Sequence, residues 1–355
     1  MDRLALYFAI FKQIKSLPPV LQADLTGKVV LVTGANTGLG FEAAKHFARM
    51  NPQRLILACR SVEKGNQAVR RIERDTGYTK AETWLLDLNR FASVQAFADR
   101  YEKEGGGRLD ILVENAAISS AQTYEKTEDG YMKTIQVNAL APSLHTFLLL
   151  PHMIRTAQEH PETNPRIVIV SSGMHHFSRL PTEVGRKISE QPNFIEALSS
   201  LEYFKQIPVA DHYSDTKLLN MFFARALQSK LSKSCPSIVV DSVDPGYCIS
   251  DLRRSLSGPG AWLLLLLDRL FAYSTEEGSR NLVHAALVGN RATVGPSEDE
   301  GQFKGAYLAT QKISNVSSFA SSGAGLRLQA KFWDEMVEIA TNKDERVAKL
   351  ATTHF

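Results

Sequence analysis

A short apolar strand followed by a glycine-rich turn constrains the fold of this chain more than any other feature. Residues 28–32 read Lys-Val-Val-Leu-Val, which is typical of a buried parallel strand. Residues 33–40 place glycines at 34, 38 and 40, and residues 41–48 carry apolar side chains at helical spacing. This order suits the pyrophosphate of a dinucleotide, because glycines let phosphates approach the positive end of the helix. We expect cofactor contacts from four residues of the turn: Gly34, Gly38, Leu39 and Gly40.

Strand and helix patterns continue to alternate through the first two-thirds of the chain. Strands that alternate with helices predict a parallel sheet covered by helices on both faces. After the first unit, a helix pattern lies at 63–74, and strand patterns lie at 54–59, 83–86, 109–113, 166–170, 237–243 and 305–309. Because there are no repeats and no low-complexity linker, the sequence predicts one α/β domain with a doubly wound parallel sheet over residues 1–355.

Composition excludes several other classes of protein. Of the 355 residues, 44% are hydrophobic and 22% are charged, as in ordinary globular proteins. A net charge of +3 argues against a nucleic-acid partner. The three cysteines have neither disulfide-framework nor zinc spacing, which fits a reducing cytosol. We therefore expect a cytoplasmic protein without a metal site.

Tyr213 and Lys217 form the second informative pattern. A gap of four residues puts both side chains on one face of a helix, one turn apart. A tyrosine with a pKa of about 10 is a poor acid or base at neutral pH, and a nearby ammonium group stabilises its phenolate. The pair therefore suits general acid–base catalysis. The same pattern is common on solvated helix faces, so its weight comes from the glycine-rich turn upstream.

Together the two patterns resemble the short-chain dehydrogenase/reductase family. The turn has the spacing Gly-x-x-x-Gly-x-Gly, and Tyr-x-x-x-Lys follows it. The resemblance covers residues 25–250 and implies a Rossmann-like fold. Further motifs match in chain order: Asp87-Leu88, Glu114-Asn115-Ala116-Ala117, Asn138, Ser171-Ser172 and Pro245-Gly246. Residues 57–60 and 244–250 are most similar to the retinol-dehydrogenase-like branch, particularly its fungal members.

The resemblance implies catalytic roles for Asn138, Ser172, Tyr213 and Lys217. Tyr213 would act as the acid/base, and Lys217 would lower its pKa and hold the nicotinamide ribose. The hydroxyl of Ser172, the second serine after the strand, would bind the substrate oxygen. Asn138 would organise a helix kink and a water that feeds protons to Lys217. Without the family pattern, the serines would be read as a turn, and Asn138 as a buried polar group satisfied locally.

The end of the second strand determines the choice of cofactor. A chain that binds NAD usually has Asp or Glu there, whereas residues 58–61 read Ala-Cys-Arg-Ser. The guanidinium of Arg60 can stack on adenine and pair with a 2′-phosphate, and Lys64 adds positive charge one turn later. These residues favour NADP(H). Thr37 argues against NADP(H), because some NADP-dependent relatives carry a basic residue at this position.

Further cofactor contacts follow from the resemblance. Asp87 would accept a hydrogen bond from the adenine amine, Asn115 would line the adenine-ribose side, and Ser250 would meet the carboxamide. Tyr213 would join Lys217 at the nicotinamide side. The family's usual Asn-Asn-Ala-Gly is altered to Glu-Asn-Ala-Ala at 114–117, which leaves the backbone geometry there open.

An N-terminal helical extension is expected over residues 1–25. Residues 4–15 have an amphipathic helix pattern interrupted by charges, and no signal-peptide cleavage site follows. We expect this helix to pack on the body of the protein, and contact with a membrane surface is the alternative. No stretch reaches the roughly 18 apolar residues of a membrane span.

Two segments depart from the plain family pattern. Residues 173–212 are an insertion, and we expect part of it to form a helix over the cleft. Four apolar residues at roughly helical spacing support this helix: Phe194, Leu198, Leu201 and Phe204. Residues 251–300, with Trp262 and a leucine run at 263–267, lie where family members carry substrate-covering helices. The apolar faces of both segments predict walls for a lipophilic substrate.

Three histidines flank the expected catalytic residues: His175, His176 and His212. Their carboxylate and cysteine neighbours do not form a metal ligand set, so we expect roles on the polar surface or in loops.

These residues and the resemblance predict an NADP(H)-dependent oxidoreductase that interconverts a ketone or aldehyde with an alcohol on a lipophilic small molecule. The fungal resemblance suggests secondary-metabolite biosynthesis, and a homodimer or homotetramer is compatible with the family. Two alternatives share the fold. A non-catalytic NADP(H)-binding or scaffold protein would not need the four catalytic residues. A sugar-nucleotide epimerase or dehydratase usually carries Gly-x-x-Gly-x-x-Gly instead.

Overall fold

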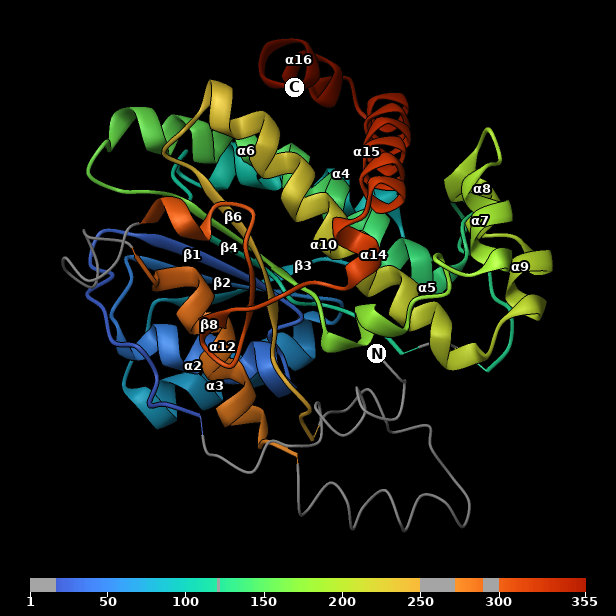
Figure 1. Cartoon of the computed structure of the whole chain (residues 1–355). Coiled ribbons are helices and arrows are strands. Elements are labelled where there is room, and N and C mark those ends of the chain that lie inside the picture. Colours follow the sequence, from blue (N-terminus) through green and yellow to red (C-terminus); the bar gives the residue numbers. More distant parts are fainter. Residues whose placement is uncertain (1–16, 120–121, 250–271, 290–299) are drawn as a thin grey trace.

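An eight-stranded sheet forms the centre of the computed structural model, which describes residues 17–119, 122–249, 272–289 and 300–355 (Figure 1). The strand order is β3-β2-β1-β4-β5-β6-β7-β8, and the first seven strands are parallel. This is the doubly wound, Rossmann-like arrangement that the sequence predicts. The bounds are β1 (Val29–Thr33), β2 (Arg54–Cys59), β3 (Ala81–Leu85), β4 (Ile111–Glu114), β5 (Arg166–Val170), β6 (Val239–Asp244), β7 (Tyr307–Ala309) and β8 (Lys312–Ile313).

The last strand, β8, is absent from the sequence prediction. It pairs antiparallel with β7. The turn between the two strands consists of Thr310 and Gln311, whose φ angles are +51° and +59°. Hairpin turns with two such residues favour asparagine or glycine. Thr-Gln carries no such signal, and two strand residues are too few for a readable periodicity, so β8 leaves no trace in the sequence pattern.

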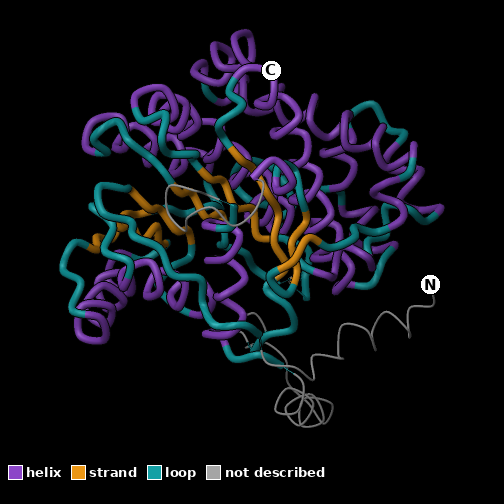
Figure 2. The backbone as a smooth tube through the Cα atoms, turned by 60° about the vertical axis from the view of Figure 1, so that its left-hand side comes forward, coloured by secondary structure: helices purple, strands orange, loops and turns teal. Residues whose placement is uncertain are grey.

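Helices cover both faces of the sheet, so that the strands lie in the interior (Figure 2). The central strand β1 shows how the layers are built. Its residue Leu31 packs into one buried cluster, whereas Val30 and Val32 pack into another, because alternate residues of a strand point to opposite faces. The first cluster includes α4, α6 and α10, and the second includes α2, α3 and α12. The longer helices are α2 (Gly38–Arg49), α3 (Val62–Thr76), α4 (Phe91–Glu104), α6 (Ala141–Glu159), α10 (Val209–Ser234) and α12 (Thr275–Leu287).

Two C-terminal helices, α15 (Gly323–Lys343) and α16 (Glu345–His354), pack on α6 and α10. The contact is aromatic: the ring of Phe147 lies 5.4 Å from that of Phe223 and 5.5 Å from that of Trp333, centre to centre. The ring of Phe355 lies 4.9 Å from that of Trp333. The chain therefore covers part of α6 and α10 with its own C-terminus. Four short helices outside the insertion are α5 (Lys133–Ile135), η1 (Gln136–Leu140), α14 (Ser318–Ser321) and η4 (Glu300–Phe303).

The insertion at 173–212 is helical, but its apolar face does not line an open wall. Phe194 and Leu198 are fully buried and belong to the same cluster as α15. The carboxylate of Glu335 on α15 accepts hydrogen bonds from the backbone N–H groups of Phe194 and Ile195, both at 2.8 Å. Leu201 is 44% exposed. The helices are η2 (Gly173–Phe177), α7 (Glu183–Ser189), α8 (Phe194–Leu198) and α9 (Leu201–Gln206).

The expected substrate wall of Phe194 and Leu198 is therefore wrong. Helical periodicity shows which side chains are buried but not which neighbour buries them, and here the neighbour is α15. The other expected wall, with Trp262 and residues 263–267, lies outside the described residues, as do most of the N-terminal extension and Ser250. Within the described ranges, no helix has the length and apolar character needed to cross a bilayer.

Candidate active site

The expected functional residues that the structure describes lie on segments near the carboxyl edge of the sheet. In a parallel sheet the carboxyl ends of all strands share one edge, and ligands bind there. Ser171 and Ser172 follow β5, Asn115 follows β4, and the turn at 33–40 follows β1. Helix α10, which carries Tyr213 and Lys217, packs against β5 and β6.

Lys217 attaches α10 to the end of β5. Its Nζ donates a hydrogen bond to the carbonyl oxygen of Val170 at 2.7 Å. In return, the hydroxyl of Ser171 donates to the carbonyl oxygen of Lys217 at 2.8 Å. The Nζ atom lies 5.4 Å from the centre of the Tyr213 ring, and only 2% of Lys217 is exposed. Tyr213 and Lys217 therefore share one helix face, and this face is not a solvated one.

Burial controls the protonation of this lysine. It lowers the pKa of Lys217 from 10.5 to about 7, because a buried ammonium loses its hydration, and the carboxylate of Asp244 acts in the opposite direction. Burial in turn raises the pKa of Asp244, although the carboxyl group is hydrogen-bonded by the N–H groups of Gly246 and Gly173 and the hydroxyl of Tyr307. The site thus holds a lysine that can change its charge near neutral pH.

Ser171 and Ser172 differ in burial and in how their hydroxyls are engaged. The hydroxyl of Ser171 is buried and engaged with α10. Ser172 is half-buried, and its Oγ caps η2 by accepting a hydrogen bond from the N–H of Met174 at 3.2 Å. That bond leaves the proton of the Ser172 hydroxyl available to donate to a ligand.

Asn138 lies in the π-helical turn η1, between α5 and α6. Its side chain accepts from the N–H of Ile118 at 2.8 Å and donates to the carbonyl oxygen of Ile118 at 2.9 Å. It also lies 3.2 Å from the hydroxyl oxygen of Thr216 on α10. This π-helical turn interrupts the α-helix at Asn138, and such turns are frequent at functional sites. The amide is satisfied by residues distant in sequence rather than by its own helix.

The glycine-rich turn forms a cradle that only glycine permits. Gly34 and Gly38 have φ angles of +66° and +62°, which side chains rarely adopt. A Cβ at Gly40 would lie 2.5 Å from Nδ2 of Asn115 and 2.7 Å from the carbonyl oxygen of Gly34. Nδ2 of Asn115 donates to the carbonyl oxygen of Thr33 at 2.8 Å, so this side chain supports the turn. With α2 beginning at Gly38, the cradle fits a pyrophosphate.

The glutamate of the altered motif at 114–117 has a partner that the sequence analysis missed. Glu114 is buried, and its Oε1 lies 2.6 Å from Nδ1 of the fully buried His145 on α6. Its Oε2 accepts from the hydroxyl of Thr33 at 3.2 Å. Thr33 Oγ1 also accepts from the N–H groups of Asn115 and Ala116, at 2.9 and 3.1 Å. A buried acidic side chain requires a hydrogen-bond partner. The glutamate at the end of a predicted buried strand was therefore the feature of the sequence that could have indicated a partner.

Arg60 and Lys64 are exposed beside the end of β2 and in the first turn of α3. Ser61 Oγ caps this helix by accepting from the N–H of Lys64 at 3.3 Å. Neither basic side chain has an ion-pair partner in the described part of the chain. Asp87, after β3, is half-buried, and its carboxylate accepts from the N–H of Asn89 at 3.1 Å.

The flanking histidines are more buried than expected. His175 is 1% exposed, lies 2.8 Å through Nδ1 from the carbonyl oxygen of Ser172, and accepts at Nε2 from the N–H of Ser317 at 3.1 Å. Burial lowers the pKa of His175 to about 3, so the ring is neutral and fixes the segment after Ser172. His212 is also buried and stacks on Phe204 with ring centres 4.9 Å apart. Of the expected roles on the polar surface or in loops, the surface role is wrong for both, because the ring of His175 packs against that of Tyr307, with centres 4.8 Å apart, and the ring of His212 packs against Phe204.

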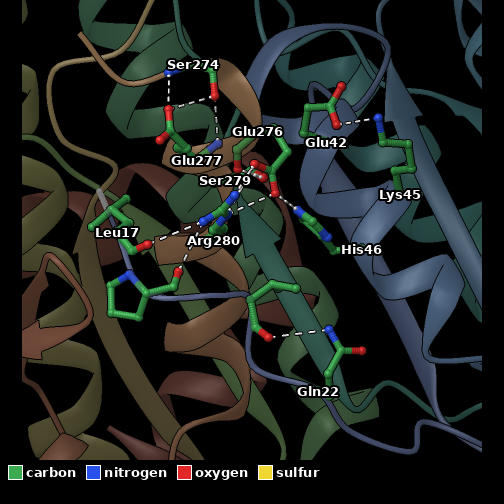
Figure 3. A network of polar contacts seen from close by, with 12 residues as sticks. Leu17, Gln22, Glu42, Lys45, His46, Ser274, Glu276, Glu277, Ser279 and Arg280 are labelled. Atoms are coloured by element: carbon green, nitrogen blue, oxygen red, sulfur yellow. Dashed lines mark hydrogen bonds and ion pairs between the residues drawn. The ribbon is translucent and has the colours of Figure 1, made fainter. Parts of the chain in front are cut away.

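A polar network joins α2, which follows the cradle, to α12 (Figure 3). Nε2 of His46 and Nη2 of Arg280 lie 3.0 and 2.6 Å from the carboxylate of Glu276. Arg280 also donates to the carbonyl oxygens of Leu17 and Pro18, both at 3.3 Å. Leu17 and Pro18, within the N-terminal extension, are therefore fixed beside α2 and α12.

Leu17 continues this contact into the site. It is 5% exposed and packs in a small cluster with Cys248 and Tyr273, against which Leu39 of the cradle also packs. Leu39 thus supports the helix start through its side chain and leaves only its backbone for a phosphate. Cys248 is held by a hydrogen bond from Sγ to the carbonyl oxygen of Pro245 at 3.3 Å.

Comparison with known proteins identifies the family. Residues 28–181 match the family described as short chain dehydrogenase. A short-chain dehydrogenase of Penicillium roqueforti is 33% identical over 94% of this chain and 83% of the relative. A short chain dehydrogenase/reductase of Cryptosporiopsis sp. is 32% identical over 94% of this chain and 95% of the relative. The chain belongs to the short-chain dehydrogenase/reductase family and is therefore an oxidoreductase, as the sequence predicts.

Solved structures share the fold at lower identity. The NADPH-bound carbonyl reductase from chicken fatty liver has a TM-score of 0.58 and 20% identity, over 84% of this chain and 99% of that one. L-sorbose reductase from Gluconobacter frateurii has a TM-score of 0.57 and 19% identity, over 80% of this chain and 95% of that one. Both support the architecture described above.

The buried lysine generates a prediction about stability and pH. Because the pKa of Lys217 falls from 10.5 to about 7 on folding, the unfolded chain binds more protons between these two values. The free energy of unfolding of the cofactor-free protein should therefore gain a rising contribution from about pH 7 to pH 10.5, lost as the pH falls. In Lys217→Met this contribution disappears, so the variant should be most favoured relative to wild type near pH 7.

Denaturant unfolding at pH 7, 8, 9 and roughly 10 would measure this difference. Lys205→Met, at an exposed lysine of the insertion, is the matched control and should follow the wild-type curve. If the free energies of unfolding of wild type and Lys217→Met changed with pH in parallel across this range, the lowered pKa of Lys217 would be contradicted.

Proposed function

We propose that this chain is an NADP(H)-dependent enzyme that interconverts a ketone or aldehyde with an alcohol on a lipophilic small molecule. One observation carries the proposal. Tyr213 and Lys217 lie one turn apart on α10, and the amine of Lys217 is buried against the end of β5, two residues before Ser172. A phenol, an amine and a hydroxyl on these adjoining segments are the groups that carbonyl reduction requires.

In the direction of reduction, a bound nicotinamide would supply a hydride to the carbonyl carbon. The O–H of Tyr213 would give its proton to the carbonyl oxygen as negative charge develops there. The hydroxyl of Ser172 would donate a hydrogen bond to the same oxygen. Protonated Lys217 would stabilise the phenolate left on Tyr213. Asn138 would hold the loop after β4, which contains Ile118, at a fixed position relative to Thr216 on α10.

The preference for NADP(H) rests on Arg60 and Lys64. Both are exposed beside the carboxyl end of β2, with no acid at the position that would bind ribose hydroxyls. Their positive charges are available for a 2′-phosphate. The carbonyl reductase with a similar fold is described as NADPH-bound, which supports the same choice here.

Apolar side chains on the catalytic segments support a lipophilic substrate. Ile118, which bonds Asn138, and Met174, which follows Ser172, are both half-buried. Phe204 is half-buried and stacks on His212, the neighbour of Tyr213. Apolar area of this kind contributes about 25 cal/mol per Å² when a ligand covers it. A place in secondary-metabolite biosynthesis is part of this proposal and rests on the fungal resemblance in sequence, with which the origin of the relatives agrees.

The mechanism predicts the effect of removing the Tyr213 hydroxyl. Tyr213→Phe keeps the ring but removes the proton donor, so turnover of aromatic ketones with NADPH should fall by about 10²–10⁴-fold. NADPH should bind as in wild type. Tyr78→Phe is the control, because its hydroxyl donates to the carbonyl oxygen of Pro52 at the opposite edge of the sheet. Near-normal turnover in Tyr213→Phe would contradict the mechanism.

Cofactor choice gives a second prediction. Arg60→Asp should weaken NADPH binding by about 1.5–3 kcal/mol, which is the contribution of hydrogen bonds to charged groups, and should shift preference toward NADH. Fluorescence titration with both cofactors would measure it. Arg70→Asp makes the same charge change at an exposed position farther along α3 and should leave the preference unchanged. Equal NADPH affinity in Arg60→Asp and wild type would show that another residue binds the phosphate.

A further inference from the structure

Asp215 lies between Tyr213 and Lys217, yet its side chain points away from solvent and is fully buried. Its Oδ1 accepts from the hydroxyl of Ser178 at 2.7 Å and from the N–H of Arg179 at 2.8 Å. Its Oδ2 accepts from the hydroxyl of Tyr203 at 2.7 Å. All three donors belong to the insertion at 173–212. A buried carboxyl group needs such partners, so the insertion and α10 are joined at this residue.

These bonds close a loop around Ser172. On one side, the hydroxyl of Ser171 is bonded to the backbone of Lys217. On the other side, η2 leads from Ser172 to Ser178 and Arg179, which are bonded to Asp215. The segment that carries Ser172 is thus fastened to α10 before and after the serine, at two positions that lie on either side of Thr216.

Other charged and titratable groups near Asp215 also join the insertion to α10. The side chain of Arg179 pairs with Asp211 in the first turn of α10. The ring of Tyr203 packs edge-on against His212 with centres 5.7 Å apart. Burial raises the pKa of Asp215 to about 6, while the three hydrogen bonds act in the opposite direction and Asp211 adds to the rise.

We propose that Asp215 is a positioning residue that sets the distance between the Ser172 and Tyr213 hydroxyls by holding the insertion against α10. The inference rests on the proposed function, in which both hydroxyls act on one carbonyl oxygen. A displacement of about 1 Å in such a pair can cost roughly 100-fold in rate. Asp215 itself touches neither substrate nor cofactor.

Two substitutions separate the contacts of Asp215 from its charge. Asp215→Ala removes all three acceptor contacts and should lower kcat with NADPH and aromatic ketones by about 10–100-fold. The NADPH dissociation constant should stay within about threefold of wild type, because the cradle and Arg60 are untouched. Asp215→Asn keeps an oxygen for Ser178 and Arg179 and offers an N–H to the Tyr203 oxygen, so its kcat should stay within about threefold.

Leu198→Ala is the control for a merely structural effect. Leu198 is fully buried where the insertion packs on α15, and it makes none of the Asp215 contacts. This variant should lose stability yet keep kcat. A kcat loss in Leu198→Ala equal to that in Asp215→Ala would overturn the proposal, as would a wild-type kcat in Asp215→Ala.

Amide hydrogen exchange followed by mass spectrometry tests the junction without turnover. Asp215→Ala should speed exchange of residues 172–180, whereas Asp215→Asn and Leu198→Ala should leave that segment as in wild type. Unchanged exchange there in Asp215→Ala would overturn the proposal. If wild type reduced no carbonyl, the proposed function would fail, and exchange would still decide whether Asp215 holds the segment of Ser172.

Discussion

The attachment of α10 to the end of β5 is the interaction on which the rest of the site depends. The amine of Lys217 and the hydroxyl of Ser171 bond reciprocal backbone carbonyls, so the strand and the helix fix each other. Desolvating an amine is costly unless its hydrogen bonds are satisfied, and Val170 supplies one of them. Because Tyr213 lies one turn before Lys217, the same bonds place the phenol beside the strand end that leads into Ser172.

Other polar contacts extend this junction in both directions along the helix. Asn138 connects the loop after β4 to Thr216, and Asp215 connects the insertion to the same turn of α10. Beneath the cradle, Glu114 and His145 bond each other inside the protein and hold Thr33. Each of these buried side chains has a hydrogen-bond partner on another segment, so the site is preorganised partly by side chains that do not themselves react.

Much of this arrangement was predictable from sequence, because the strands alternate with helices and the glycine spacing is specific. The seven parallel strands, the cradle and the shared face of Tyr213 and Lys217 follow from local patterns. The contacts that fix them are distant in sequence. His145 stands 31 residues after Glu114, and Glu335 stands 141 residues after Phe194. No periodicity reports such partners, which is why the insertion was predicted as a helix but assigned to the wrong neighbour.

In the proposed reaction, this site passes a hydride and a proton to a carbonyl group. Incubation with NADPH deuterated at one C4 position, each stereoisomer separately, and with a panel of aromatic ketones would test it most directly. Mass spectrometry of the alcohol should show one deuterium per NADPH oxidised for one stereoisomer only, at the former carbonyl carbon. Cofactor bound at saturation with no labelled alcohol from either stereoisomer would contradict the claim.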